Sequence, residues 1–129
     1  MRARKLQFRL KRAYDPPEPG DGVRVLVDRL WPRGLRRDGA QIDLWLKDVA
    51  PSANLRRWFG HDPARFAEFS RRYQVEMDQL SEPLRTLRQL ARKGTVTLLF
   101  GAKDREHNQA MVLAARLRDR PSATVAADR

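Results

Sequence analysis

The sequence predicts a small single α/β domain with a mostly parallel sheet of about three or four strands covered by helices. The chain has 129 residues, of which 41% are hydrophobic, and this suffices for one core. Short apolar runs of strand length lie near both ends, and segments of helical periodicity fill the stretch between them. Strands separated by helices pair in parallel through crossover connections. We expect one domain over residues 1–118 and a disordered tail over 119–129.

The first strand is expected near residues 7–10, where polar and apolar residues alternate. A proline-rich loop over 14–20 ends it. The second strand, 23–27, ends in residues apolar enough to be buried on both faces. Residues 43–49 are expected to form a short helix or turn before Pro51. Because a three-stranded sheet is thin, an extra edge strand or a dimer contact is compatible with the pattern.

Capping residues mark the helices in the middle of the chain. Ser52 is a suitable N-cap for a helix that Gly60 ends, and Asp62 followed by Pro63 begins the next helix. The apolar stripe of this second helix extends to Leu80.

Another helix is expected over residues 84–93, with Gly94 in the C′ position. Residues 95–100 form the clearest strand. Asp104 is expected to cap the last helix, which ends before Pro121.

The charge composition of the chain limits the kinds of molecule that it is expected to bind. The formal net charge of +11 favours anionic small molecules or polyanions. The first twelve residues carry no acid and six basic residues, which are Arg2, Arg4, Lys5, Arg9, Lys11 and Arg12. Elsewhere the charges mostly alternate along helix faces. Nucleic-acid binding is therefore kept as an alternative.

Other features exclude several classes of protein. The chain has no cysteine and two histidines, which argues against a disulfide framework, a thiolate site and a dedicated transition-metal site, so no cofactor is expected. It lacks an apolar run long enough to span a membrane and a secretory signal, and we expect a cytoplasmic monomer or homodimer. Glycine motifs for dinucleotide or P-loop binding, and a nucleophile elbow, are absent.

The loop over residues 28–34, DRLWPRG, is the first half of a candidate site. In open α/β sheets, ligands bind beyond the carboxyl ends of the strands. Arg29 and Arg33 offer planar forks to a carboxylate or phosphate, Trp31 offers a stacking surface, and Gly34 permits close backbone approach or a positive φ. The alternatives are that Asp28 and Arg29 pair with each other or with neighbours, and that Trp31 only plugs the sheet end.

The loop after the last strand is the second half of the candidate site. Lys103 and Asn108 would help to bind the anion there, while His107 or Asp104 would handle a proton. The alternatives are a cap for Asp104 and a surface or cap-associated histidine for His107. If the two strands are parallel neighbours, the two loops converge.

Two residues of a helix are further candidates. Arg56 and Trp58 would line the same cleft, although arginines are common on helix surfaces. His61, just before a helix cap, is expected to be structural or exposed. Tyr73 lies on the core stripe, where its hydroxyl reaches the rim at most.

Several strings occur together in this chain: YDP over residues 14–16, DRLWPRG over 28–34, WLKDVAPS over 45–52, LRRWF over 55–59 and TLLFGAKD over 97–104. They resemble the domain-of-unknown-function family 488 (DUF488), in its short YeaO-like branch, over about residues 5 to 118. The resemblance implies a compact cytoplasmic α/β domain of bacteria or archaea without an established reaction. Longer relatives carry a cysteine-histidine-arginine element after the last strand. Here the corresponding residues are His107, Asn108 and Gln109, so no thiol chemistry is carried over.

Three functions remain open from the sequence. The first is binding of, or action on, a small anionic molecule, phosphorylated or nucleotide-like, in a cleft at the carboxyl ends of the strands. The second is a nucleic-acid-binding module that uses the basic surface. The third is a structural or adaptor protein whose arginines only brace its own loops.

Overall fold

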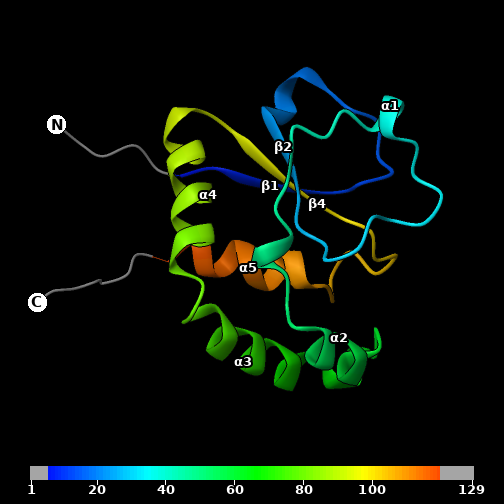
Figure 1. Ribbon diagram of the computed structural model, residues 1–129, viewed down its shortest axis with the longest axis vertical. Helices are drawn as coiled ribbons and strands as arrows, with labels where there is room; N and C mark the ends of the chain where they lie inside the picture. Colours follow the sequence, from blue (N-terminus) through cyan, green and yellow to red (C-terminus); the bar gives the residue numbers. More distant parts are fainter. Residues whose placement is uncertain (1–5, 120–129) are drawn as a thin grey trace, which may run out of the picture.

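The computed structural model describes residues 6–119, and its sheet has four parallel strands (Figure 1). The strands are β1 (Phe8–Arg12), β2 (Val23–Leu26), β3 (Leu44–Trp45) and β4 (Val96–Phe100), in the spatial order β1-β4-β2-β3. Val96 of β4 lies opposite Phe8 on one side and Val23 on the other. The predicted α/β class with a mostly parallel sheet is confirmed, and the carboxyl ends of the strands share one edge.

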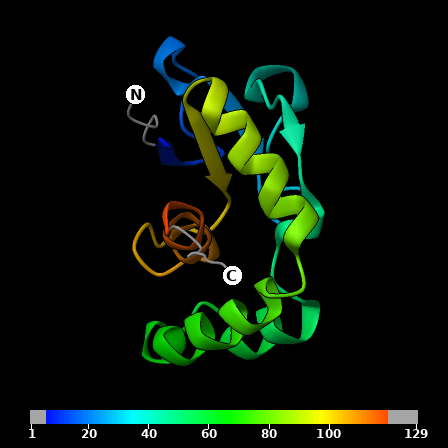
Figure 2. The same cartoon turned by 90° about the vertical axis from the view of Figure 1, so that its left-hand side faces the viewer.

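Four longer helices and one single-turn helix accompany the sheet. They are α1 (Arg37–Ala40), α2 (Ala53–Phe59), α3 (Phe66–Met77), α4 (Ser81–Lys93) and α5 (Gln109–Arg118), with short 3-10 turns η1 (Pro19–Asp21), η2 (Lys47–Val49) and η3 (Pro63–Arg65). In Figure 1, α5 lies between the sheet and the α2–α3 pair. Figure 2 shows that α4 runs alongside β4. None of the described helices is long and apolar enough to cross a membrane.

The main core lies between one face of the sheet and these longer helices. Alternate strand residues such as Val25 and Leu98 point into it, where they meet Leu87 of α4 and Leu113 of α5, all fully buried. Side chains of a strand alternate between the two faces, so the helices need to cover only one of them. The fold is therefore a two-layer α/β domain.

Loops cover the opposite face of the sheet. Leu26 and Leu99 are fully buried there in a small cluster that Trp31 and Trp45 help to close. This agrees with the expectation that the end of the second strand is buried on both faces.

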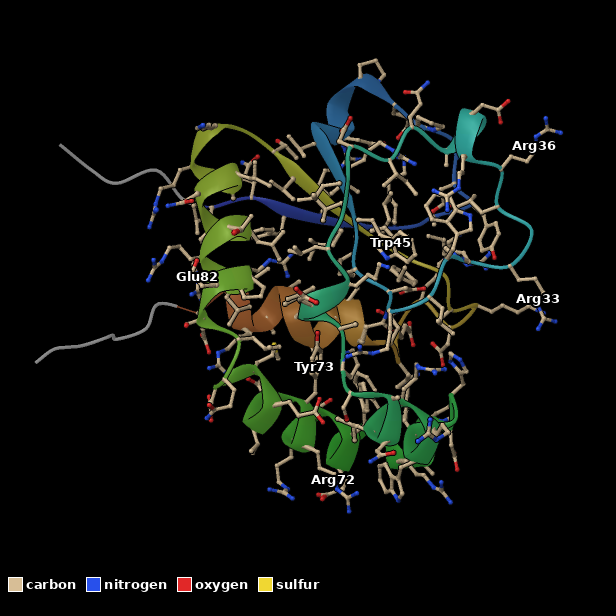
Figure 3. The ribbon with its side chains drawn as sticks, in the orientation of Figure 1. Arg33, Arg36, Trp45, Arg72, Tyr73 and Glu82 are labelled. Carbon is tan, nitrogen blue, oxygen red and sulfur yellow. The ribbon has the colours of Figure 1, made fainter. Side chains whose placement is uncertain are left out.

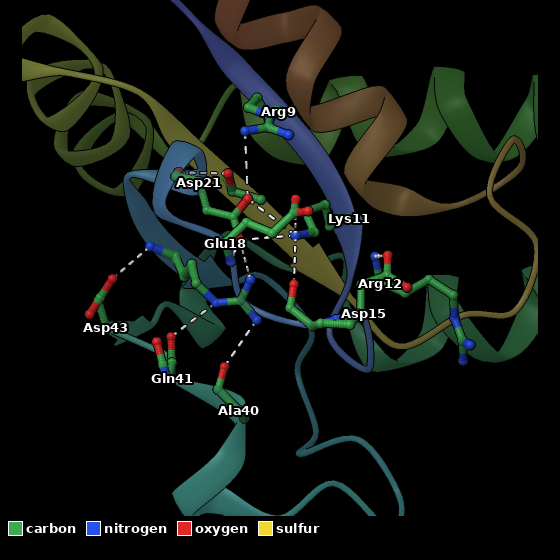
Figure 4. Close-up of polar contacts among 12 residues, drawn as sticks. Arg9, Lys11, Arg12, Asp15, Glu18, Asp21, Ala40, Gln41 and Asp43 are labelled. Atoms are coloured by element: carbon green, nitrogen blue, oxygen red, sulfur yellow. Dashed lines mark hydrogen bonds and ion pairs between the residues drawn. The ribbon is translucent and has the colours of Figure 1, made fainter.

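Beside this cluster lies a polar one, centred on Asp21 (Figure 4). The Asp21 carboxylate accepts hydrogen bonds from Lys11 at 3.0 Å and from Arg24 at 2.6 Å. Arg24, which is 3% exposed, also donates to the carbonyl oxygens of Ala40 and Gln41.

Local capping signals give the expected helix ends. The Ser52 hydroxyl accepts from the Leu55 N–H at 3.1 Å, and Gly60 ends α2 with a φ of 54°. The Asp62 carboxylate accepts from the Ala64 N–H at 3.0 Å and begins the η3–α3 segment.

Three expectations about local structure need correction. Residues 43–49 contain the edge strand β3 before η2, because the main chain of Leu44 and Trp45 pairs with β2. Asn108, not Asp104, is the N-cap of α5, and its side chain accepts from the Met111 N–H at 3.0 Å. Gly94 follows α4 in extended backbone, with a φ of 169°, instead of a left-handed C′ conformation. The predicted tail lies outside the described residues beyond Asp119.

Candidate functional site

The loops after β2 and β4 meet at the carboxyl edge of the sheet, as the sequence pattern leads us to expect. The Val27 N–H donates to the Leu99 carbonyl oxygen at 3.0 Å and continues the pairing beyond the strand. The Gly101 N–H donates to Asp28 Oδ2 at 2.9 Å. A Cβ on residue 101 would lie 2.9 Å from that oxygen, so the close approach needs glycine.

A pocket of about 270 Å³ opens at this edge. Its apolar walls include Phe59, Phe69 and Pro32. Its charged and polar lining includes Asp28, Arg29, Arg33, Arg56, His61 and Gln109. These charged and polar residues come from the loop after β2, from α2 and the turn that follows it, and from the start of α5. A mostly apolar hollow with a few convergent polar groups is typical of a small-molecule site.

The candidate site residues divide into two groups. Arg29, Trp31, Arg33 and Arg56 line the pocket. The others lie outside its lining: Gly34, Trp58, Lys103, Asp104, His107 and Asn108.

Arg29 is anchored at the pocket wall. Its guanidinium donates to the carbonyl oxygens of Pro51 at 3.1 Å and Ala50 at 3.5 Å. It does not pair with Asp28, so of the two alternatives the pairing of these side chains with each other is wrong, while bonding of each to neighbouring groups is what the structure has. Arg29 therefore braces the chain before α2, and it forms no ion pair with the other described residues.

Arg33 and Arg56 are exposed, and their guanidinium groups form no hydrogen bond or ion pair with the described residues. The loop that carries Arg33 is fixed by its main chain, because the Tyr14 hydroxyl donates to the Arg33 carbonyl oxygen at 2.6 Å. Figure 3 shows the Arg33 side chain extending outward from this loop. Gly34, the next residue, has a φ of 77°, the positive value that the sequence allowed for.

Trp31 is largely part of the loop-side cluster. Its indole N–H donates to the Leu35 carbonyl oxygen at 2.9 Å, its ring packs edge-on against Trp45, and the Arg37 guanidinium lies 4.2 Å from its centroid. Trp58 on α2 is covered by Arg72, 4.3 Å from its centroid. Neither ring is free on both faces to stack on a ligand.

The turn before α5 satisfies its own polar groups. The Asp104 carboxylate accepts from the Glu106 and His107 N–H groups at 2.9 and 3.0 Å, and it contacts His107 Nδ1 at 2.9 Å. The Glu106 N–H and then the His107 side chain lower the pKa of Asp104. The His107 ring packs edge-on against Phe66. Proton transfer by Asp104 or His107 would take place outside the pocket.

Asp28 belongs to the candidate loop, but the sequence analysis did not include it among the ligand-binding residues. Its carboxylate lines the pocket and accepts from the Gly101 N–H and from the Gln109 side-chain amide. Its carbonyl oxygen accepts from the Trp45 indole at 2.8 Å. Burial raises the pKa of Asp28 to about 6, although the Gly101 and Gln109 hydrogen bonds and the charges of His61 and Arg56 act in the opposite direction.

Sequence reasoning also missed His61 and Gln109 as lining residues. His61 follows the glycine that ends α2 and has a φ of 57°, which directs the chain back along the pocket. Gln109 is the first residue of α5, next to its N-cap. A weak signal existed for His61, which follows the recognisable helix stop at Gly60, but not for Gln109, because the start of the last helix was expected at Asp104.

A second hollow, of about 630 Å³, lies between α3, α4 and α5 and is also rich in arginine. Arg116 donates to Asp78 at 2.7 Å and to the Gln74 side chain, while Arg88 donates to carbonyl oxygens at the end of α5. These two arginines thus hold helices together. Among residues 6–119, no group of three or more acidic or histidine side chains is placed to hold a metal ion.

The chain is a small parallel α/β domain with a mostly apolar pocket, lined by a few charged groups, at the carboxyl ends of its strands. The chain belongs to the DUF488 proteins, and the family model that it matches, over residues 7–128, is described as the inactive DUF488-N3 subclade. The family resemblance read from the sequence is confirmed.

Two relatives illustrate the match. The uncharacterized protein Rv3073c of Mycobacterium tuberculosis is 44% identical over 117 residues, which cover 91% of this chain and 98% of that protein. The uncharacterized protein YeaO of Escherichia coli K12 is 41% identical over 113 residues, which cover 88% and 98% of the two chains. No solved structure matches the chain.

Proposed function

We propose that this protein binds a small anionic molecule in the pocket at the carboxyl ends of β2 and β4. The observation that carries the proposal is the state of three pocket arginines, Arg29, Arg33 and Arg56. Within residues 6–119, none of them forms an ion pair. Guanidinium groups without an ion-pair partner beside a partly enclosed pocket suit a carboxylate or a phosphate. Those of Arg33 and Arg56 have no acceptor among the described residues, whereas Arg29 also donates to the main-chain carbonyl oxygens of Ala50 and Pro51.

Three observations favour binding without turnover. The matching family model is described as inactive, and the chain contains no cysteine that could act as a nucleophile. In addition, the candidate proton-transfer pair, Asp104 and His107, lies outside the pocket lining.

The nucleic-acid alternative receives less support from the N-terminal segment. Of its basic residues, Lys11 bonds to Asp21, Arg9 lies 3.6 Å from the same carboxylate, and Arg12 donates to the carbonyl oxygens of Gly101 and Ala102. These cations serve the fold. Arg2, Arg4 and Lys5 lie outside the described residues.

A thermal-shift titration tests the proposal. Phosphate, sulfate, a sugar phosphate, a nucleotide and a dicarboxylate are added to the unmutated protein, to Arg56→Ala and to Arg36→Ala. Arg56 is preferred to Arg29 for substitution because Arg29 also braces the chain. Arg36 is a matched control, because it is exposed, lies outside the pocket lining and carries the same charge.

We expect at least one small anion to raise the melting temperature, since a ligand that binds only the folded state stabilises it. Arg56→Ala should weaken that binding about tenfold, and Arg36→Ala should leave it within about twofold. Equal weakening by both substitutions would mean that only net charge matters. Stabilisation by DNA or RNA alone would favour the nucleic-acid alternative.

A further inference from the structure

The Asp28 carboxylate retains unused hydrogen-bonding capacity inside the pocket. An ionised carboxylate offers about four acceptor positions. Two are used, one by the Gly101 N–H at 2.9 Å and one by the Gln109 amide. These two bonds hold the carboxylate in a fixed orientation at the pocket wall.

Within residues 6–119, no cation forms an ion pair with this carboxylate. Arg29 donates to main-chain carbonyl oxygens instead, and Arg56 and His61 influence Asp28 through charge without a hydrogen bond. A partly buried carboxylate without an ion-pair partner is unfavourable, as its raised pKa of about 6 indicates. A ligand that donates a hydrogen bond would relieve this cost.

Charge and size restrict the ligand further. With histidine counted as neutral, three arginines and one ionised aspartate leave the pocket with two positive charges, which matches a dianion such as a phosphate monoester or a dicarboxylate. At about 30 Å³ of liquid per water molecule, 270 Å³ corresponds to about nine waters, which is room for a small molecule. A hydroxyl group suits Asp28 better than an ammonium group, because it adds no positive charge to this cationic pocket.

We infer that the ligand is a small dianion that carries a hydroxyl group, with the anionic groups on Arg29, Arg33 and Arg56 and the hydroxyl donating to Asp28. This inference rests on the proposed function and makes Asp28 the residue that determines specificity. The shared chemistry covers hydroxylated phosphate monoesters and hydroxylated dicarboxylates.

Two pairs of probes test the inference by calorimetric titration at pH 7.5. Glycerol 3-phosphate is compared with propyl phosphate, and malate with succinate, so that the hydroxyl groups are the main difference within each pair. One hydrogen bond to a charged acceptor corresponds to about tenfold in affinity. We expect this preference for the hydroxylated member in whichever pair binds, and the pair that binds identifies the anion.

Two substitutions of Asp28 test whether this residue causes the preference for the hydroxylated probe. In Asp28→Asn the acceptor is neutral, and the preference should fall to about threefold, since a neutral hydrogen bond is about half as strong. In Asp28→Leu it should vanish. Asp38→Asn, which removes an equal charge from exposed α1, should keep the tenfold preference. Should the Asp28 variants fail to fold, carbon-13 NMR of the unmutated protein supplies the answer, because a donating hydroxyl lowers the pKa of Asp28 relative to that in the complex with the matched probe.

The outcomes distinguish anion binding by the pocket from selection of a hydroxyl group by Asp28. If none of the four probes binds although another anion of the thermal-shift series stabilises the protein, the inference fails and the proposed function stands. If no anion of either set binds, the proposed function itself fails. If probes bind with equal affinity within each pair, or if the preference persists in Asp28→Leu, the pocket binds anions but Asp28 does not select a hydroxyl group. An equal pKa of Asp28 in both complexes would likewise overturn the inference.

Discussion

Asp21 and Asp28 flank the same strand, β2, and their carboxylates are held in opposite ways. Asp21 is fully buried, yet Lys11, the Glu18 N–H and Arg24 together outweigh burial, the largest single effect, and lower its pKa. Asp28 is partly buried, bonds only to uncharged donors, and has a pKa raised to about 6. A carboxylate that is saturated by cations stabilises the fold, whereas one left without a cation beside a pocket is available to a ligand.

The largest expected effect concerns Asp21. Asp21→Asn removes the negative charge and leaves the guanidinium of Arg24, 3% exposed, without a counter-ion, while the Lys11 ammonium keeps only the exposed Glu18 carboxylate. Breaking a buried ion pair on one side destabilises a protein by about 3–5 kcal/mol. Urea unfolding at pH 7 measures the loss. Asp38→Asn, in an exposed pair with Arg36, should cost under about 0.5 kcal/mol. If Asp21→Asn lowered the free energy of unfolding as little as Asp38→Asn, the contrast between Asp21 and Asp28 would be lost.

The second effect concerns Asp28 and pH. Because the folded-state pKa of about 6 exceeds the ordinary value of 3.8, the native state binds the proton more tightly than the unfolded chain does. Ionisation therefore costs stability as the pH rises from about 4 to about 6. Relative to Asp28→Asn, the unmutated protein should lose about 2 kcal/mol between pH 4 and pH 7. Urea unfolding of both proteins across this range gives the difference, and parallel curves would contradict the assigned environment.

The third and smallest effect concerns Gly101. A Cβ there would lie 2.9 Å from Asp28 Oδ2 and 3.4 Å from the Pro32 Cβ, so Gly101→Ala must displace the carboxylate. We expect a cost of about 1–2 kcal/mol, together with weaker anion binding. Gly39→Ala is the matched control, because nothing lies within 4 Å of its Cβ position in α1, and it should be neutral or slightly stabilising. An unchanged stability of Gly101→Ala would show that the Asp28 side chain can move freely.

The features that could be predicted from the sequence are those that depend on residues close together in the chain. The caps at Ser52 and Asp62 and the stop at Gly60 depend on a few neighbouring residues, and these predictions are confirmed. The parallel order of the long strands followed from the intervening helices. An extra edge strand was allowed for, but its position at Leu44–Trp45 was not predicted, because β3 has two residues and depends on main-chain pairing with β2.

The site was anticipated only as a meeting of two loops. Arg29, Arg33 and Arg56 line the pocket, but the residues that complete it depend on tertiary contacts. The bond between Gly101 and Asp28 spans 73 residues of sequence, and Gln109 reaches Asp28 over 81. Lys103 and His107 were chosen because they follow a strand, but the turn closed by Asp104 keeps them outside the pocket lining.

Amide chemical-shift mapping tests the central claim most directly. Nitrogen-15-labelled protein is titrated with glycerol 3-phosphate and malate, and the two arginine-rich hollows are compared in the same spectra. We predict saturable shifts at Gly101, at the Gln109 side-chain amide and around Arg29, with none in the hollow that Arg88 and Arg116 line. Saturable shifts confined to that second hollow, or no shifts at the first, would contradict the claim that the pocket beside Asp28 is the binding site.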